Sequence, residues 1–119
     1  MRTMGWMGAA SVVLCACASS PVPTEQLAKS EAAIRSAQEH GAQGVPAAAL
    51  NVKVANESMG IARGFIAEGD NQRAKYILMR AEADAELAKS LAREAQVRSD
   101  AQKAMGQLQQ IRNTVPEGT

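Results

Sequence analysis

The sequence is poor in the residue types that build active sites and stacking surfaces. Its 119 residues include one histidine, two cysteines, one tryptophan, one tyrosine and one phenylalanine. Catalytic triads, His-based metal centres and aromatic platforms for bases therefore have almost nothing to be built from. The 13 basic and 12 acidic side chains nearly balance, which argues against nucleic acid as a partner. We expect a protein that is not an enzyme and holds no metal or cofactor.

Both cysteines lie in the stretch LCAC, behind an apolar run near the N-terminus. Arg2 precedes a stretch without charged residues, which is the pattern of a secretory signal, and the run is shorter than the roughly 20 residues that span a bilayer. LCAC resembles a bacterial lipobox, with Leu14, the small Cys15 and Ala16 before the acceptor Cys17. The resemblance implies cleavage between Ala16 and Cys17 and a covalent lipid on Cys17. The alternative is an ordinary signal peptide, cleaved nearby, that leaves a free thiol.

Several acyl chains on one cysteine would anchor the protein firmly, because each buried CH₂ contributes about 0.8 kcal/mol. Ala18 follows the acceptor cysteine, whereas aspartate at that position is associated with inner-membrane retention in the lipoprotein class. The resemblance therefore implies an outer-membrane protein that faces the periplasm. We predict a signal peptide over 1–16, a lipidated cysteine and tether over 17–23, a helical domain over 24–112 and a tail over 113–119. The tether residues 18–23 would reach at most about 20 Å.

Three helices are predicted in the helical domain, because apolar residues recur there with period 3.6 rather than 2. The first runs from Glu25 to about His40, with Thr24 as its N-cap. The second begins at Pro46 or Ala47, with proline at the first helical position, and runs to residue 68. The third runs over 71–112, after a turn at Gly69 and Asp70. The fold class is therefore all-α, a thin antiparallel three-helix arrangement in which a helical hairpin has a long C-terminal helix, preceded by a signal peptide.

Apolar rows suggest which faces of these helices pack. In the second helix we assign the row to Leu50, Val54, Ile61 and Phe65, with Ser58 in the same row. We expect Gly60 and Gly64 to permit close approach of another helix. In the third helix the row is almost entirely alanine, flanked by Ile77 and Leu91. Its members are Ala74, Leu78, Ala81, Ala85, Ala88, Ala92 and Ala95.

The stretch GFIAEGDNQRAKYILMRAEADAELAKSLA, residues 64–92, resembles the small Ala-rich envelope lipoproteins of domain-of-unknown-function family 4398. The similarity includes the Gly69-Asp70 turn, the DAELA segment at 84–88 and the TEQLA opening at 24–28, and it covers roughly residues 24–95. It implies a helical envelope domain without catalytic residues to transfer. In that family an OmpA-like peptidoglycan-binding domain often follows, and residues 96–119 contain none, so the resemblance leaves contact with peptidoglycan possible but does not indicate it.

The few polar candidates for a site have simpler interpretations. His40 lies at a predicted helix end, where a cation interacts favourably with the macrodipole. The carboxylates of Glu82 and Glu86 share one helix face while Asp84 lies nearly opposite, so the three diverge instead of converging on a cation.

The third helix is too long for its neighbours, so residues 93–112 should overhang. A narrow apolar stripe marks this overhang, formed by Val97, Ala101, Met105 and Leu108, with Ala104 and Ile111 beside them. A narrow stripe on a polar helix is typical of a two-helix seam. We interpret it as a surface for self-association or for a partner protein of the envelope. The alternative is that the overhang frays or bends back at Gly106.

These features predict an outer-membrane-anchored lipoprotein that faces the periplasm and acts as a non-enzymatic binding or scaffold module of the cell envelope. The alternative is a structural spacer that oligomerises through its C-terminal helix and contacts peptidoglycan non-covalently.

Overall fold

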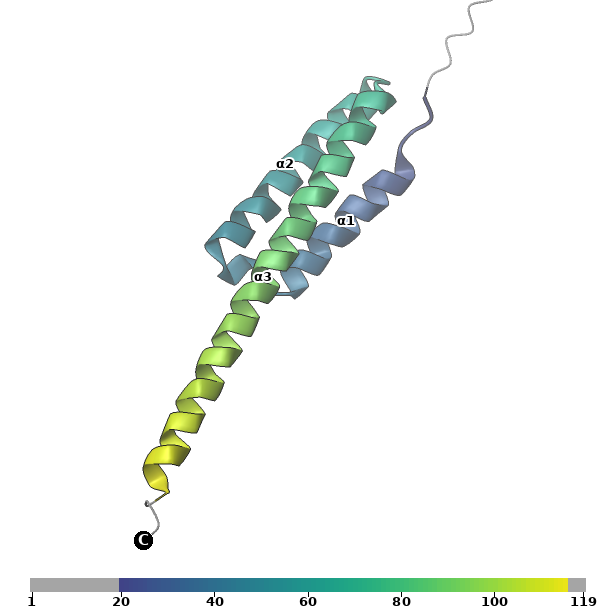
Figure 1. The fold of residues 1–119 in the computed structure, drawn as a ribbon. Coiled ribbons are helices and arrows are strands. Elements are labelled where there is room, and N and C mark those ends of the chain that lie inside the picture. The colour runs from purple at the N-terminus through teal and green to yellow at the C-terminus, as the bar shows by residue number, and fades with distance from the viewer. Residues whose placement is uncertain (1–19, 116–119) are drawn as a thin grey trace, which may run out of the picture.

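A computed structural model describes residues 20–115, which form three helices and one short 3₁₀ turn (Figure 1). The helix α1 spans Thr24–Glu39, the 3₁₀ turn η1 spans Ala42–Gly44, α2 spans Pro46–Ala67 and α3 spans Asn71–Thr114. No strand occurs within these residues. Both the all-α class and the antiparallel three-helix arrangement with a long C-terminal helix are confirmed. The signal peptide and the lipidation site predicted over 1–17 lie outside the described residues.

The first helix begins one residue earlier than predicted. Thr24 is its first residue and Pro23 its N-cap, so the prediction that the Thr24 side chain caps the helix is wrong. The Pro23 carbonyl accepts the first helical hydrogen bond from the Leu27 amide at 3.0 Å. Proline fixes φ near the helical value, which prepares the chain for the first turn. At the other end Gly41, with φ +80°, ends the helix as predicted.

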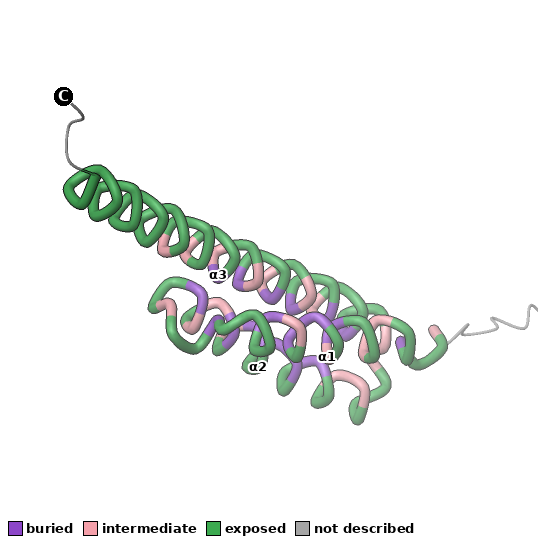
Figure 2. Tube along the Cα trace, turned by 90° about the horizontal axis from the view of Figure 1, so that it is seen from below, coloured by how far each residue is buried: buried purple, intermediate pink, exposed green. Residues whose placement is uncertain are grey.

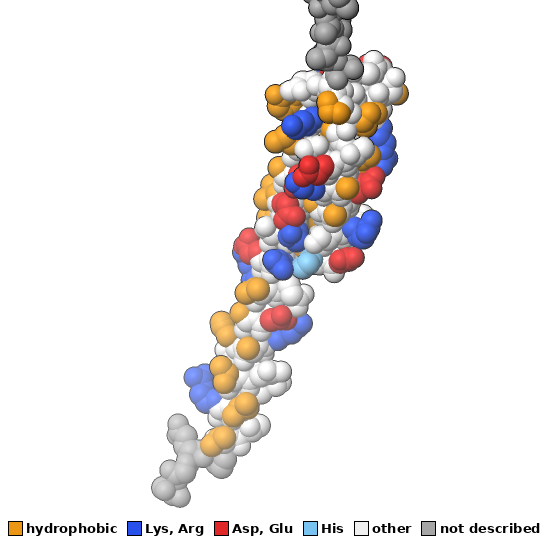
Figure 3. All heavy atoms as spheres, turned by 90° about the vertical axis from the view of Figure 1, so that its right-hand side faces the viewer, with side chains coloured by type: hydrophobic (Ala, Val, Ile, Leu, Met, Phe, Trp, Pro, Cys, Tyr) orange, Lys and Arg blue, Asp and Glu red, His pale blue; other side chains and the backbone are white. Residues whose placement is uncertain are grey.

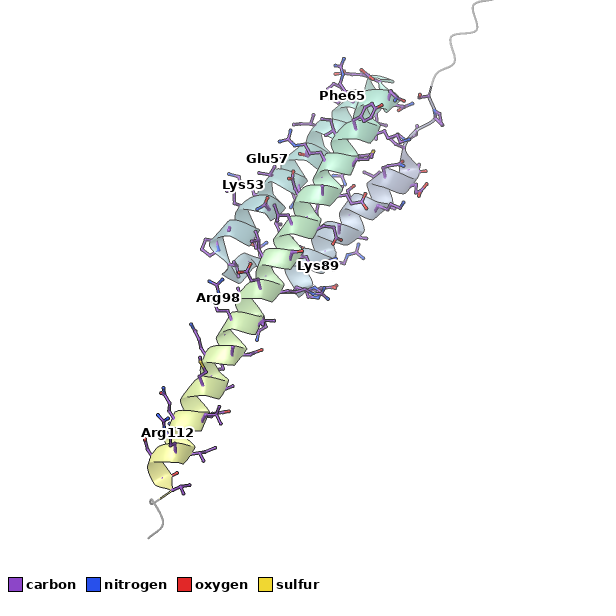
Figure 4. The ribbon with its side chains drawn as sticks, viewed as in Figure 1. Lys53, Glu57, Phe65, Lys89, Arg98 and Arg112 are labelled. Carbon is purple, nitrogen blue, oxygen red and sulfur yellow. The ribbon has the colours of Figure 1, made fainter. Side chains whose placement is uncertain are left out.

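The turn between α2 and α3 has the predicted chemistry. Gly69 has φ +81°, a value that costs glycine little because it has no Cβ. The Asp70 carboxylate accepts a hydrogen bond from the Arg73 amide at 3.1 Å and so caps the N-terminus of α3. The guanidinium of Arg73 lies 4.9 Å from the ring centre of Phe65, which Figure 4 labels at this end of the bundle.

The core lies on one face of α3, because α1 and α2 both pack against α3 and contact each other much less. Figure 2 shows the buried residues on the inner sides of the three helices, with α1 and α2 on the same side of α3. The predicted alanine row of α3 forms this face and is buried from Ala74 to Ala92. Leu78 is the largest side chain with no exposed surface. Small side chains let the helix backbones approach closely.

The row predicted for α2 is only partly packed. Ser58 is buried and Phe65 is half-buried against the core. Leu50 and Ile61, however, are 61% and 54% exposed, and the buried face lies about 100° further round the helix. That face contains Ala48, Val52, Ala55, Ser58, Met59 and Ala62. The reason is steric: a helix that approaches the alanine row of α3 closely presents mainly small side chains to it, so most of the bulkier row turns outward.

Gly60 and Gly64 do not serve close packing either. A Cβ placed on either residue would meet no atom within 4 Å. The expectation that these glycines admit another helix is therefore wrong for the contacts within this chain.

We expect Gly60→Ala and Gly64→Ala each to raise the free energy of unfolding by about 1 kcal/mol, because alanine restricts the unfolded chain and favours helix. Urea titration of each variant measures this change. Gly69→Ala is the control, since its positive φ strains any residue with a Cβ and should lower stability. A loss of stability in Gly60→Ala would show that the open space beside this residue is needed.

Beyond the bundle, α3 continues as a single helix without a break at Gly106, so of the two alternatives for the overhang the structure has the continuous helix. Every residue from Asp100 to Val115 is exposed, and the helix extends two residues past the expected end at Arg112. Figure 1 shows this overhang extending from the end of the bundle opposite to the one at which α1 begins. Its 44 residues make α3 about 66 Å long.

Candidate functional site

Three parts of the molecule could carry function: the N-terminal segment that leads to the predicted lipid, the polar side chains of the bundle, and the exposed face of α3. The lipobox residues Leu14, Cys15, Ala16 and Cys17 lie outside the described residues. What the structure does describe is the chain directly after them.

Residues 20–23 are docked against the start of α3. Asn71 Nδ2 donates a hydrogen bond to the Ser20 carbonyl oxygen at 2.6 Å, and the Ser20 hydroxyl donates to Gln72 Oε1 at 3.4 Å. Pro23 is buried. A cavity of about 270 Å³ lies beside this contact, between residues 20–26 and the first turn of α3. Of the segment 17–23 that was predicted as lipidated cysteine and tether, the structure describes residues 20–23, and these contact α3.

This docking places residues 20–23 at the end of the molecule where α3 begins. Ser20 lies three residues after Cys17 in sequence and contacts the first residues of α3. The overhang is the other end of the same helix. Residues 20–23 and the exposed tip of α3 are therefore at opposite ends of the molecule (Figure 1).

The bundle surface carries ion pairs but no converging set of ligands. Arg63 on α2 contacts Glu31 on α1 at 2.8 Å, beside an open cavity of about 310 Å³. Glu86 pairs with Lys89, and Asp84 lies 3.8 Å from Arg80. Within residues 20–115 no group of three His, Cys, Asp or Glu side chains is placed to hold a metal ion.

His40 lies at the C-terminal end of α1, as predicted, and is exposed. Its Nδ1 donates a hydrogen bond to the Ser36 carbonyl oxygen at 2.7 Å. The same carbonyl accepts a hydrogen bond from the His40 amide at 3.1 Å, so the imidazole adds a second hydrogen bond to it at the helix end. This is a structural role for the ring nitrogen.

The Glu25–Lys29 pair at the start of α1 is the clearest electrostatic interaction. The carboxylate and the ammonium are 2.7 Å apart. The hydrogen bond from Lys29, and then its charge, lower the pKa of Glu25, and the same contacts raise the pKa of Lys29. The Glu25 part of the stabilisation is present above the unfolded-state pKa of Glu25 and is lost as pH falls through the lowered folded-state pKa.

We therefore expect a carboxyl-carbon NMR titration of Glu25 to give a pKa below the ordinary value. In Lys29→Gln the pKa of Glu25 should rise toward that value, because both the hydrogen-bonded ammonium and its charge are removed. Lys103→Gln, a charge change far along α3, is the control and should leave it unchanged. An unchanged Glu25 titration in Lys29→Gln would mean that this pair does not form in solution.

The exposed face of the overhang carries the predicted stripe. Val97, Met105 and Leu108 are 69%, 59% and 66% exposed, and Ala101 between them is exposed as well. Ile111 and Val115 continue the row toward the tip. The structure thus places all four predicted seam residues on a helix that no other part of residues 20–115 covers.

The first part of α3, within the bundle, also carries exposed apolar side chains that were not predicted from the sequence. Tyr76, Met79 and Leu87 are each about half exposed or more, although they belong to the bundle. The signal that could have revealed them is their spacing, since they lie on the helix face opposite the alanine row. Within the described residues, no helix is both long and apolar enough to cross a membrane.

Comparison with known proteins adds the family. Residues 25–104 match the family described as Domain of unknown function (DUF4398). No curated protein and no solved structure matches the chain. Because the matched segment is well over half of the sequence, the chain belongs to this family.

Proposed function

We propose that this member of the DUF4398 family is a lipoprotein of the bacterial outer membrane that faces the periplasm and acts as a non-enzymatic binding or scaffold module. The observation that carries this proposal is the arrangement of its two ends. The docked segment at Ser20 follows the predicted lipid site closely, and the exposed apolar stripe lies at the far end of α3.

The distances favour presentation of the overhang away from the membrane surface. The three residues from Cys17 to Ser20 reach at most about 10 Å. A lipid on Cys17 would therefore hold the α2–α3 turn close to the membrane. With α3 about 66 Å long, its tip would project well into the periplasm whenever the helix stands upright.

The scarcity of candidate catalytic side chains in the described residues favours a binding role over catalysis. Most carboxylates of the bundle pair with Lys or Arg on the surface, and the single histidine bonds to its own helix. An apolar stripe on a projecting helix is suited instead to another helix as its partner.

Metabolic labelling with palmitate tests the anchor. Label on the wild-type chain should persist in Cys15→Ala and disappear in Cys17→Ala, because Cys17 is the proposed acceptor. The Cys17→Ala protein should also leave the outer-membrane fraction. Label that persists in Cys17→Ala would disprove the proposed anchor.

A spacer that touches peptidoglycan non-covalently is the second candidate, and the length of the overhang favours it. Sedimentation with isolated peptidoglycan tests this role. The matched comparison is a chain shortened to end at residue 95, which lacks the overhang and should lose any binding that depends on it.

A further inference from the structure

The exposed apolar row extends along nearly all of α3. In the bundle it consists of Tyr76, Met79 and Leu87, and in the overhang it continues through Val97, Leu108 and Ile111. We call this row the outer stripe. Tyr76 is two residues from the buried Leu78, so the two side chains point about 200° apart around the helix. Figure 3 shows apolar side chains along one edge of the molecule, over both the bundle and the overhang.

The spacing of the outer stripe is that of a coiled coil. From Leu87 to Ile111 the stripe follows positions 87, 90, 94, 97, 101, 104, 108 and 111, which are separated alternately by three and four residues, a heptad pattern. Between the large side chains these positions hold the small residues Ser90, Ala101 and Ala104 and one charged residue, Glu94. A row with a mean spacing of 3.5 residues stays on one side of a helix only when that helix winds around a partner.

The length of the stripe restricts what can cover it. From Tyr76 to Ile111 it extends about 53 Å. The helices α1 and α2, with 16 and 22 residues, are shorter than this and already pack on the other face of α3. A matching partner is a helix as long as α3 with the same spacing. We propose that the outer stripe pairs with the outer stripe of a second copy of this chain, the two α3 helices running parallel and in register.

The parallel direction rests on the proposed function, because two copies anchored in one leaflet through Cys17 present their overhangs the same way. The second α3 meets the face that α1 and α2 leave free (Figure 2), so pairing requires no rearrangement of either bundle.

The charges near the middle of the stripe fit this pairing. Glu94 is the single charged residue at the stripe positions from Leu87 to Ile111, and it pairs with Arg98 at 2.6 Å. Arg93 is its neighbour in sequence. In a parallel pair the two Glu94 carboxylates share a layer that four guanidinium groups flank, which relieves the repulsion between them.

The contact area is that of a modest interface. A stripe about 53 Å long and about 10 Å wide covers about 500 Å² on each copy, or about 1,000 Å² in total, near the lower bound for a specific complex. We therefore expect a weak dimer in dilute solution. Confinement of both copies to one membrane raises their effective concentration and favours the dimer there.

Cysteine crosslinking in the full chain, expressed in a bacterial envelope, tests the pairing. Val97→Cys and Leu108→Cys are made separately. Each should yield about tenfold or more disulfide-linked dimer than the matched control Gln110→Cys, as expected when the second thiol is held at millimolar effective concentration. Gln110 is exposed on the other face of the overhang, two residues from Leu108. The unsubstituted chain, with only Cys15 and Cys17, sets the background.

Each outcome decides the proposal. Dimers from both single variants support parallel pairing. A dimer that forms only when Val97→Cys and Leu108→Cys are coexpressed indicates an antiparallel pair and overturns the proposal. A crosslink to a different protein also overturns it. So does a dimer yield from Val97→Cys and Leu108→Cys that equals the yield from Gln110→Cys. Palmitate labelling is measured in the same cells, so that loss of crosslinking with retained label rejects the dimer alone, and loss of label with retained crosslinking rejects the anchor alone.

Discussion

Ala85→Leu is expected to lower the free energy of unfolding by about 1–3 kcal/mol, the usual cost of adding methylenes to a well-packed core. Ala85 has no exposed surface and lies in the middle of the alanine row of α3, where both α1 and α2 pack. A leucine there must push a helix away or adopt a strained rotamer. Chemical denaturation of the substituted and wild-type chains measures the difference.

The matched control is Ala83→Leu, two residues earlier and on the exposed face of the same helix. It should change the free energy of unfolding by less than about 0.5 kcal/mol, as exposed substitutions usually do. It also enlarges the outer stripe, so any change in self-association should be an increase. Equal stability of Ala85→Leu and wild type would mean that the three helices do not approach as closely as the structure requires.

The success of the α3 prediction and the failure of the α2 prediction have the same physical origin. In α3 the row of Ala81, Ala85 and Ala88 belongs to a run of apolar residues that recurs every three or four residues without a polar interruption, so its spacing identified the packed face. In α2 two apolar rows compete, and the row with Leu50 and Ile61 is the more hydrophobic of the two. Helix separation decided between them, and this distance depends on the partner helix rather than on the sequence of α2.

The N-terminal segment illustrates a second limit. Ser20, Pro21 and Pro23 read correctly as a stretch without helix, but composition cannot reveal that it docks. The docking depends on a hydrogen bond between Asn71 and Ser20, which are 51 residues apart in sequence. Local sequence patterns predict local structure well. A contact between residues distant in sequence depends on the tertiary arrangement, here on the turn at Gly69 that brings the start of α3 beside the start of α1.

The candidate surface was predicted in part for a related reason. The four seam residues of the overhang stand out because the sequence around them is polar. Tyr76, Met79 and Leu87 stand beside buried residues of the bundle in sequence, and only their spacing, opposite the alanine row, separates them from the core. Once the alanine row is known to face α1 and α2, the second row on α3 becomes recognisable as one surface with two parts.

Leu78→Ala is expected to have the largest effect on stability of any single truncation in the bundle, about 2–5 kcal/mol, since it removes apolar contacts and leaves a cavity. Leu78 has no exposed surface and belongs to a buried cluster made up mainly of alanine, whose short side chains cannot move in to fill the space. For a domain of this size each 1 kcal/mol lowers Tm by about 4–8 °C. Thermal unfolding followed by far-UV circular dichroism should therefore show a fall well beyond 5 °C.

Leu50→Ala is the control for the same chemical change in α2. Leu50 is 61% exposed, so its loss should cost less than about 0.5 kcal/mol. This comparison also tests the corrected packing of α2, because the row first assigned to its core would make Leu50 a costly residue to truncate. A loss in Leu50→Ala as large as that in Leu78→Ala would mean that α2 is rotated in solution relative to the structure, with Leu50 turned toward α3.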